Sequence, residues 1–108
     1  MADVFLKVNN KMITIKGRAI VAARDLLKIT QRELAVACQI SKTTLSHIES
    51  EAIQPRASTI RKIAGELTKR GIEFTNGTGL GVRVDYKKAA AYETSQAENP
   101  PVEPDLES

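Results

Sequence analysis

Residues 30–49, TQRELAVACQISKTTLSHIE, carry two short helical patterns with a turn between them. Thr30 and Glu33 have the spacing of a capping box, in which the threonine hydroxyl accepts from the third backbone N–H and the glutamate reaches back to the threonine amide. We therefore expect a helix over residues 31–38. Its apolar residues, which would be buried, are Leu34, Ala35 and Cys38.

A second helix is expected over about 42–50, after a short turn. Ser41 is a favourable N-cap residue for it, and Leu45 and Ile48, three positions apart, would face inward. The rest of this helix presents Lys42, Thr43, Thr44, Ser46 and His47. Surface helices usually carry residues of higher helix propensity than Ser and Thr, so this face indicates contact with a partner.

Further helices flank this pair. Residues 18–28 have apolar residues at helical spacing, namely Ile20, Ala23, Leu26 and Leu27. Residues 57–70 do likewise, with Ile60, Ile63, Ala64 and Leu67 on one stripe. Gly71 follows as a helix stop signal. Because short helices are marginal in water on their own, we expect the four to pack on one another.

Strands are expected before and after the helices. Residues 4–8 and 12–16 are runs rich in β-branched residues around an Asn-Asn turn, and they predict a β-hairpin. After the last helix, residues 72–74 lead into a glycine-containing turn, and residues 80–84 alternate as a strand does. The expected fold class is therefore mainly α, a domain of four to five helices with short added strands at the N-terminus and after the helices.

The chain divides into three parts. Residues 1–16 form the hairpin, a candidate dimerisation element, and residues 17–86 form the helical domain with its C-terminal strand. Residues 87–108 are an acidic tail that we expect to be disordered, although Ala89–Ala91 could extend briefly as helix. The reason is that residues 93–108 hold three prolines, many glutamates and almost no large apolar side chain to offset the entropy of ordering.

The charge is unevenly distributed. Residues 1–86 carry 14 Lys and Arg against 8 Asp and Glu, a net charge of +6, whereas residues 87–108 carry 2 against 5, a net charge of −3. A basic body favours a polyanionic partner. No apolar run approaches the ~18 residues of a membrane span, and the N-terminus lacks the pattern of a secretion signal, so we expect a cytoplasmic protein without membrane contact.

The residues that could carry catalysis are few. One cysteine, Cys38, and one histidine, His47, cannot form an internal disulfide or a Cys/His zinc cluster. Cys38 fits a small core residue and Glu49 a structural partner better than either fits a reactive group. We find no catalytic constellation, and we expect a protein that is not an enzyme and uses no metal or cofactor.

Three motifs within residues 18–67 resemble the Cro/phage-repressor (Xre-type) helix-turn-helix family. They are Thr30-Gln31-x-Glu33-Leu34-Ala35, then Ile40-Ser41-x-x-Thr44-Leu45-Ser46-x-Ile48-Glu49, then Pro55-Arg56 followed by Thr59-Ile60-x-Lys62-Ile63-Ala64. The resemblance covers about half of the chain and implies a lambda-repressor-like fold. The chain departs from the family at Gln39, where Gly is usual, in the loop over 50–54, which lacks cations, and in its added N-terminal strands.

The resemblance also implies that the second helix of the motif enters the major groove of double-stranded DNA. Carried over position by position, the residues that contact base edges are Lys42, Thr43, Thr44 and His47. Those that contact phosphates are Gln31, Ser41, Ser46, Arg56, Arg18 and Lys16. Because this face has no Arg, Asn or Gln to bind a base in a bidentate manner, we expect ~1–3 kcal/mol at most from each base contact and a contribution from DNA shape.

The function implied is that of a sequence-specific transcription regulator. Two-fold dimers place two recognition helices about 34 Å apart, so we expect a homodimer on a palindromic operator. Its interface would involve the strands, whose edges otherwise present unpaired backbone groups, through Phe5, Leu80, Val82 and Val84. We expect an autoregulating repressor of a bacterial phage or mobile element. If the protein instead activates transcription, its partner would be RNA polymerase. The alternative is an antitoxin that binds both its own operator and a toxin protein.

Overall fold

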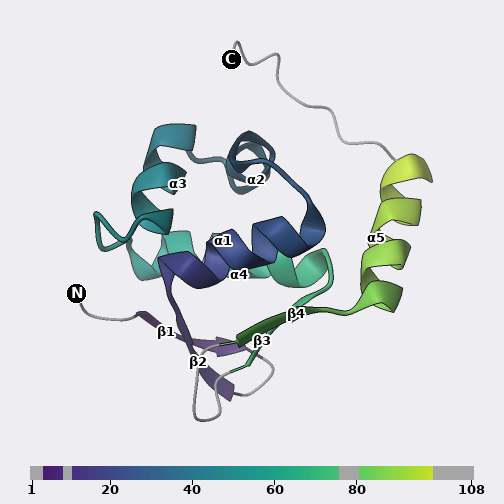
Figure 1. Ribbon diagram of the computed structural model, residues 1–108, viewed down its shortest axis with the longest axis horizontal. Coiled ribbons are helices and arrows are strands. Elements are labelled where there is room, and N and C mark those ends of the chain that lie inside the picture. Colours follow the sequence, from purple (N-terminus) through teal and green to yellow (C-terminus); the bar gives the residue numbers. More distant parts are fainter. Residues whose placement is uncertain (1–3, 9–10, 76–80, 99–108) are drawn as a thin grey trace.

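The computed structural model describes residues 4–8, 11–75 and 81–98 (Figure 1). Its elements are β1 (Val4–Val8), β2 (Lys11–Ile15), α1 (Gly17–Leu27), α2 (Gln31–Cys38), α3 (Lys42–Glu49), α4 (Ala57–Lys69), β3 (Ile72–Thr75), β4 (Gly81–Val84) and α5 (Tyr86–Glu98). Figure 1 shows α1 to α4 gathered into one body, with the strands below them and α5 at the edge. The expected mainly α architecture is confirmed, and the first four helices end within one residue of their predicted limits.

The N-terminal hairpin predicted from the sequence is present. β1 and β2 pair in antiparallel register, from Val4 opposite Ile15 to Val8 opposite Lys11. The Asn-Asn turn between them lies outside the described residues. Only Lys16 separates β2 from α1, so the hairpin leads almost directly into the helical body.

A second hairpin was predicted only in part. β4 is the strand expected over 80–84, but β3 replaces what was expected as a simple lead into a turn. Ile72 lies opposite Val84 and Phe74 opposite Val82. Both β3 residues are buried against the helices, and this tertiary burial is what stabilises a strand whose four residues give too short an alternation to be recognised in the sequence.

The core is aliphatic apart from Phe74, and it draws on α1 to α4, on β3 and on Ile15 of β2. Its largest fully buried side chains are Ile20, Leu34, Leu45, Ile60, Ile63, Leu67 and Ile72. The inward faces predicted for the helices are therefore confirmed, with one exception. Leu26 is 44% exposed, because its neighbour Leu27 packs against the core and adjacent residues of a helix point about 100° apart.

Gly17 sets the distance between α1 and α3. A Cβ atom at this position would lie 2.6 Å from the carbonyl oxygen of Glu49 and closer still to that of Ile48. Both oxygens belong to the backbone and cannot move aside as a side chain would. Any larger residue would therefore push the first turn of α1 away from the last turn of α3.

The prediction of disorder was wrong for the first part of the acidic tail, because residues 86–98 form α5. Asp85 caps this helix, with its Oδ1 accepting from the Lys88 amide at 3.0 Å. The Tyr92 ring lies 4.9 Å from the Arg70 guanidinium carbon, which ties α5 to the end of α4. The three prolines of the tail all follow Glu98, so they do not oppose the helix; residues 99–108 lie outside the described part of the chain.

Candidate nucleic-acid interface

The turn between α2 and α3 has the geometry of a helix-turn-helix connection. The predicted capping box is confirmed, with Glu33 N donating to Thr30 Oγ1 and Thr30 N donating to Glu33 Oε1, both at 3.0 Å. Gln39 adopts left-handed backbone angles with φ of 58°. These angles favour glycine and cost other residues about 1–2 kcal/mol, which is the strain expected from the absence of Gly at this position.

Ser41 begins α3 as predicted. Its hydroxyl accepts from the Thr44 amide at 3.0 Å and donates to the Thr44 hydroxyl at 2.8 Å. Thr44 is consequently half-buried and already engaged, while its neighbours Lys42 and Thr43 are exposed. The cap thus fixes the first turn of the helix and leaves the next side chains free to reach outward.

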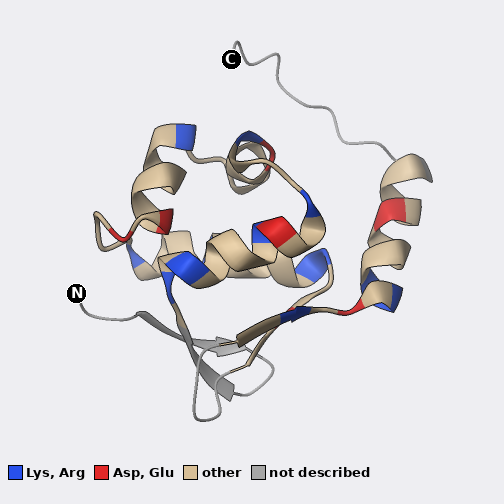
Figure 2. Ribbon diagram, in the orientation of Figure 1, with Lys and Arg blue, Asp and Glu red and all other residues tan. Residues whose placement is uncertain are grey.

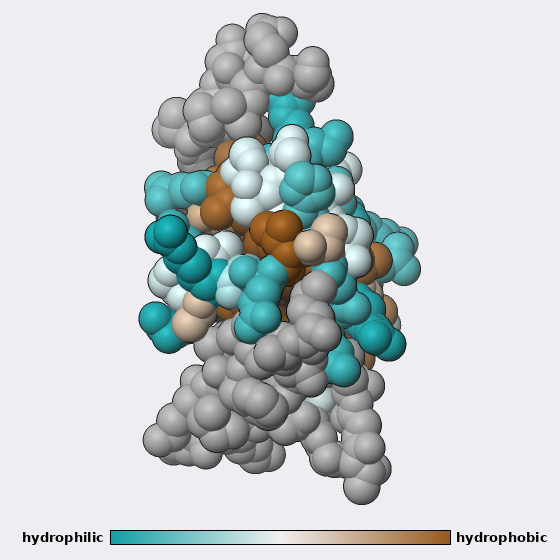
Figure 3. All heavy atoms as spheres, turned by 90° about the vertical axis from the view of Figure 1, so that its left-hand side faces the viewer, coloured by the Kyte–Doolittle hydropathy of each residue, from teal (hydrophilic) through white to brown (hydrophobic). Residues whose placement is uncertain are grey.

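The outer face of α3 carries polar side chains, as expected. Leu45 and Ile48 are buried, whereas Lys42, Thr43 and His47 are exposed and Ser46 is half-buried. Figure 3 views the side of the molecule on which α3 lies, and it shows a pale zone of intermediate hydropathy, the shade of Ser and Thr, with hydrophilic residues along part of its edge and a hydrophobic patch directly below it. Hydroxyl groups can both donate to and accept from base edges or phosphates.

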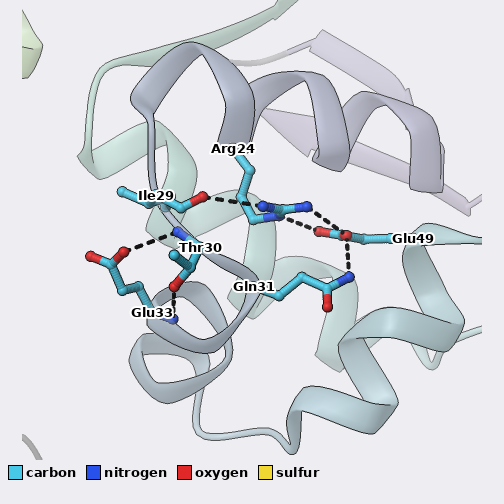
Figure 4. A network of polar contacts seen from close by, with 6 residues as sticks. All are labelled: Arg24, Ile29, Thr30, Gln31, Glu33 and Glu49. Carbon is cyan, nitrogen blue, oxygen red and sulfur yellow. Dashed lines mark hydrogen bonds and ion pairs between the residues drawn. The ribbon is translucent and has the colours of Figure 1, made fainter.

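A buried ion pair holds α3 in place (Figure 4). Glu49, which is 7% exposed, accepts from Arg24 Nε at 2.7 Å and from Arg24 Nη2 at 3.0 Å. Gln31 Nε2 donates to the same carboxylate at 2.7 Å, and Arg24 Nη1 donates to the carbonyl oxygen of Ile29 at 3.1 Å. Three helices therefore meet at one carboxylate, and the structural role expected for Glu49 is confirmed.

The expected phosphate contact of Gln31 assumed that its side-chain amide is free. The amide is instead already engaged in a hydrogen bond. One of its two N–H groups points to Glu49, so a contact with DNA would depend on the second N–H group and on the backbone amides of the first turn of α2. The ion-pair network fixes the orientation of this side chain at the surface. The sequence could not predict that Glu49 positions Gln31, because the two residues lie 18 positions apart.

The other predicted phosphate contacts lie around the helix ends. Arg18 is exposed, and its Nη2 lies 3.7 Å from Glu51 Oε1. Arg56 is exposed at the N-cap of α4, and Lys16 is half-buried at the N-cap of α1. These cations therefore stand near the loop after α3, whereas Gln31 is the first residue of α2.

An open depression of about 610 Å³ lies between the ends of α1, α2 and α3. It is lined by Arg24, Lys28, Ile29, Thr30, Gln31, Arg32 and Lys42. Figure 2 shows basic residues where α1 ends and where α2 and α3 begin. Gln31 and Lys42 were predicted as site residues. The sequence did not indicate that Lys28 and Arg32 lie beside them, because these residues belong to different elements and only the fold brings them together.

The expected dimer residues give a mixed result. Val82 and Val84 are half-buried against the core of their own chain, so they are not a free apolar face. Phe5 lies in β1 opposite Thr14, and Leu80 lies outside the described residues. Any pairing between subunits would thus rest on backbone edges more than on the two valines.

Cys38 behaves as a core residue. It is buried, its Sγ lies 3.8 Å from the carbonyl oxygen of Lys62, and burial raises the pKa of the thiol to about 11. The thiolate that redox and metal chemistry require is therefore disfavoured near neutral pH. Within residues 4–8, 11–75 and 81–98, His, Cys, Asp and Glu form no group of three that could hold a metal ion.

The capped helix pair, the polar outer face of α3 and the basic surroundings define a helix-turn-helix DNA-binding domain. Comparison with known families agrees, because residues 20–71 match a family described as helix-turn-helix. Residues 20–71 therefore form a domain of the Xre or lambda-repressor-like helix-turn-helix family, which is a family of DNA-binding regulatory domains and not of enzymes. Among curated proteins, none matches the chain significantly. In the described part of the chain, all helices are too short or too polar to traverse a bilayer.

Proposed function

We propose that the protein regulates transcription by binding a specific operator with α3 in the major groove. The observation that carries this proposal is the exposed polar face of α3 on a helix fixed by the Arg24–Glu49 pair. Its base-contacting residues would be Lys42, Thr43, Thr44 and His47. Thr44 would act chiefly through its methyl group on a thymine, since its hydroxyl already accepts from Ser41.

The phosphate contacts would frame this helix on both sides. On one side we propose Gln31 and Ser41, and on the other Arg56, Arg18 and Lys16, with Ser46 on α3 itself. The Ser41 hydroxyl now donates its proton to Thr44 Oγ1, so it would exchange this acceptor for a phosphate oxygen. Arg18 would exchange its partner Glu51 for a phosphate, which costs little because exposed ion pairs contribute little to stability. Such contacts set orientation and affinity, whereas the base contacts set sequence preference.

We further propose that the protein acts as a homodimer and an autoregulating repressor in the cytoplasm, as expected for a phage or mobile-element switch. A single α3 reads only half a site, and a two-fold dimer would read two half-sites about 34 Å apart. Among the described residues, each sheet has only two strands and so offers an edge that pairs with no further strand, which supports a role for the strands in dimerisation.

The test is footprinting of the protein on the DNA upstream of its own gene. Wild type should protect two half-sites one helical turn apart, and Thr43→Ala or His47→Ala should abolish protection while the circular dichroism spectrum stays unchanged. Thr94→Ala, at an exposed position of α5, is the matched control and should protect like wild type. Protection by the Thr43 and His47 variants that equals wild type would contradict the assignment of α3.

The alternative of an antitoxin has one supporting observation. α5 and the N-terminal hairpin lie outside the matched residues 20–71, and α5 exposes most of its side chains, including Tyr86 at 82%. A toxin could bind there while α3 stays on DNA. Co-expression with the product of an adjacent gene would favour this reading if the two proteins formed a complex of fixed stoichiometry that Tyr86→Ala weakened.

A further inference from the structure

The depression beside α3 gathers three cations from three different elements. Lys28 is the C-cap residue of α1, Arg32 lies in the first turn of α2, and Lys42 is the first residue of α3. All three line the same open surface, together with the polar residues Thr30 and Gln31. The sequence separates Lys28 from Lys42 by a whole helix, so this clustering is a product of the fold.

The positive charge of the depression is not balanced from within. In the part of the chain that the structure describes, Lys28, Arg32 and Lys42 have no carboxylate within ion-pair distance. No Asp or Glu lines the depression. Arg24 also lines it, but Glu49 neutralises that charge. Three unpaired cations on one concave surface repel one another and attract a polyanion.

The backbone conformation of Lys28 is a further indication that the depression binds an anion. It adopts left-handed backbone angles with φ of 58°, a conformation that Gly or Asn adopts at lower cost. A lysine there is not the choice that stability favours. It does, however, place a long cationic side chain at the rim of the depression, where its ammonium group can reach a bound anion.

We propose that Lys28 and Arg32 bind a phosphodiester group of the DNA backbone, with Lys42 at the edge nearest the bases. This inference rests on the proposed function, because it takes the duplex to lie along α3. Lys42 belongs both to the depression and to α3, so a strand that passes α3 also crosses the depression. The surface is open, as binding to a continuous strand requires.

The two residues should therefore strengthen binding to any duplex sequence. A phosphate contact by a cation contributes about −0.9 to the slope of log K against log salt concentration, which corresponds to about eightfold in affinity at about 0.1 M salt. Thr43 and His47, in contrast, should affect only the operator. The roles of the two sets of residues are thus separable by measurement.

The experiment measures duplex binding by fluorescence anisotropy across salt concentrations, with the protected operator and with a scrambled duplex. Lys28→Asn keeps a residue that accepts left-handed angles, and Arg32→Gln keeps a helix former. Each should reduce affinity for both duplexes about eightfold. Each should also make the negative slope of log K against log salt concentration shallower by about 0.9. Lys87→Gln, an exposed cation on α5, is the control and should leave the slope unchanged.

The outcomes separate this inference from the proposed function. If wild type binds the operator but Lys28→Asn and Arg32→Gln retain its slope and affinity, the inference is wrong and the function stands. If wild type binds neither duplex at low salt, the proposed function itself fails. Calorimetry with inorganic phosphate adds a third arm. If wild type binds free phosphate, and both variants lose this binding but bind duplex like wild type, the depression is a site for a small anion and the inference is overturned.

Discussion

Replacing Glu49 by glutamine should destabilise the domain severely. The Glu49 side chain is 4% exposed and receives three hydrogen bonds, two of them from the Arg24 guanidinium. Glutamine has nearly the same shape but no charge, and its NH2 group cannot accept from Arg24 or Gln31. The variant therefore leaves the guanidinium of Arg24, whose side chain is 19% exposed, without its counter-ion.

Removing one partner of a buried ion pair costs about 3–5 kcal/mol. Arg24 keeps its bond to the Ile29 carbonyl oxygen and some contact with water, so we expect the lower end, about 3 kcal/mol. With a urea m-value of roughly 1.5 kcal/mol/M, the unfolding midpoint should fall by about 2 M. Urea unfolding followed by circular dichroism measures this shift directly.

Glu73→Gln provides the matched control. Glu73 Oε1 lies 2.6 Å from Arg83 Nε, a shorter contact than any at Glu49, but its side chain is 32% exposed. The hydrogen bond from Arg83 lowers the pKa of Glu73, yet water can replace an exposed partner, so the midpoint should move little. An equal loss in the two variants, or a loss under about 1 kcal/mol for Glu49→Gln, would refute the reasoning from burial. The double variant Arg24→Met, Glu49→Leu should recover most of the lost stability.

Other substitutions test separate features of the fold. Gly17→Ala should lower the unfolding midpoint more than any exposed substitution and should weaken DNA binding, because its methyl group would meet the carbonyl oxygen of Ile48; a midpoint equal to wild type would show that α1 can shift. Gln39→Gly should stabilise by about 0.5–1 kcal/mol in the same assay, since it relieves left-handed strain, and a destabilised variant would contradict that account. Cys38 should cause a loss of stability as pH rises from about 9 to about 11, because the unfolded thiol ionises before the folded one. Urea unfolding at pH 8 and pH 10 should therefore show a smaller alkaline loss in Cys38→Ala than in wild type, and equal losses would exclude the thiol as a cause.

Local signals in the sequence predicted the helices well. The Thr30–Glu33 box and the Ser41 cap each involve residues three positions apart, and both hydrogen-bond patterns are present. Such contacts form within one turn and need no tertiary partner. For the same reason the limits of α2 and α3 were predicted within one residue.

Features that depend on distant residues were not predictable in this way. Arg24 and Glu49 lie 25 positions apart, so their pairing required the packing of α1 on α3. Composition also misled for α5, where the acidic, proline-containing tail suggested disorder although Asp85 and Tyr92 anchor a helix. The basic depression combines three elements, and a sequence pattern cannot show which of many scattered cations converge.

The contact at Gly17 has an electrostatic consequence for α3. Helix carbonyls carry partial negative charge at the C-terminal end, and helix amides carry partial positive charge at the N-terminal end. Because the first residue of α1 lies against the carbonyl oxygens of Ile48 and Glu49, the positive end of α1 offsets the negative end of α3. An approaching polyanion would thus encounter mainly the positive end of α3, where Lys42 adds its own charge.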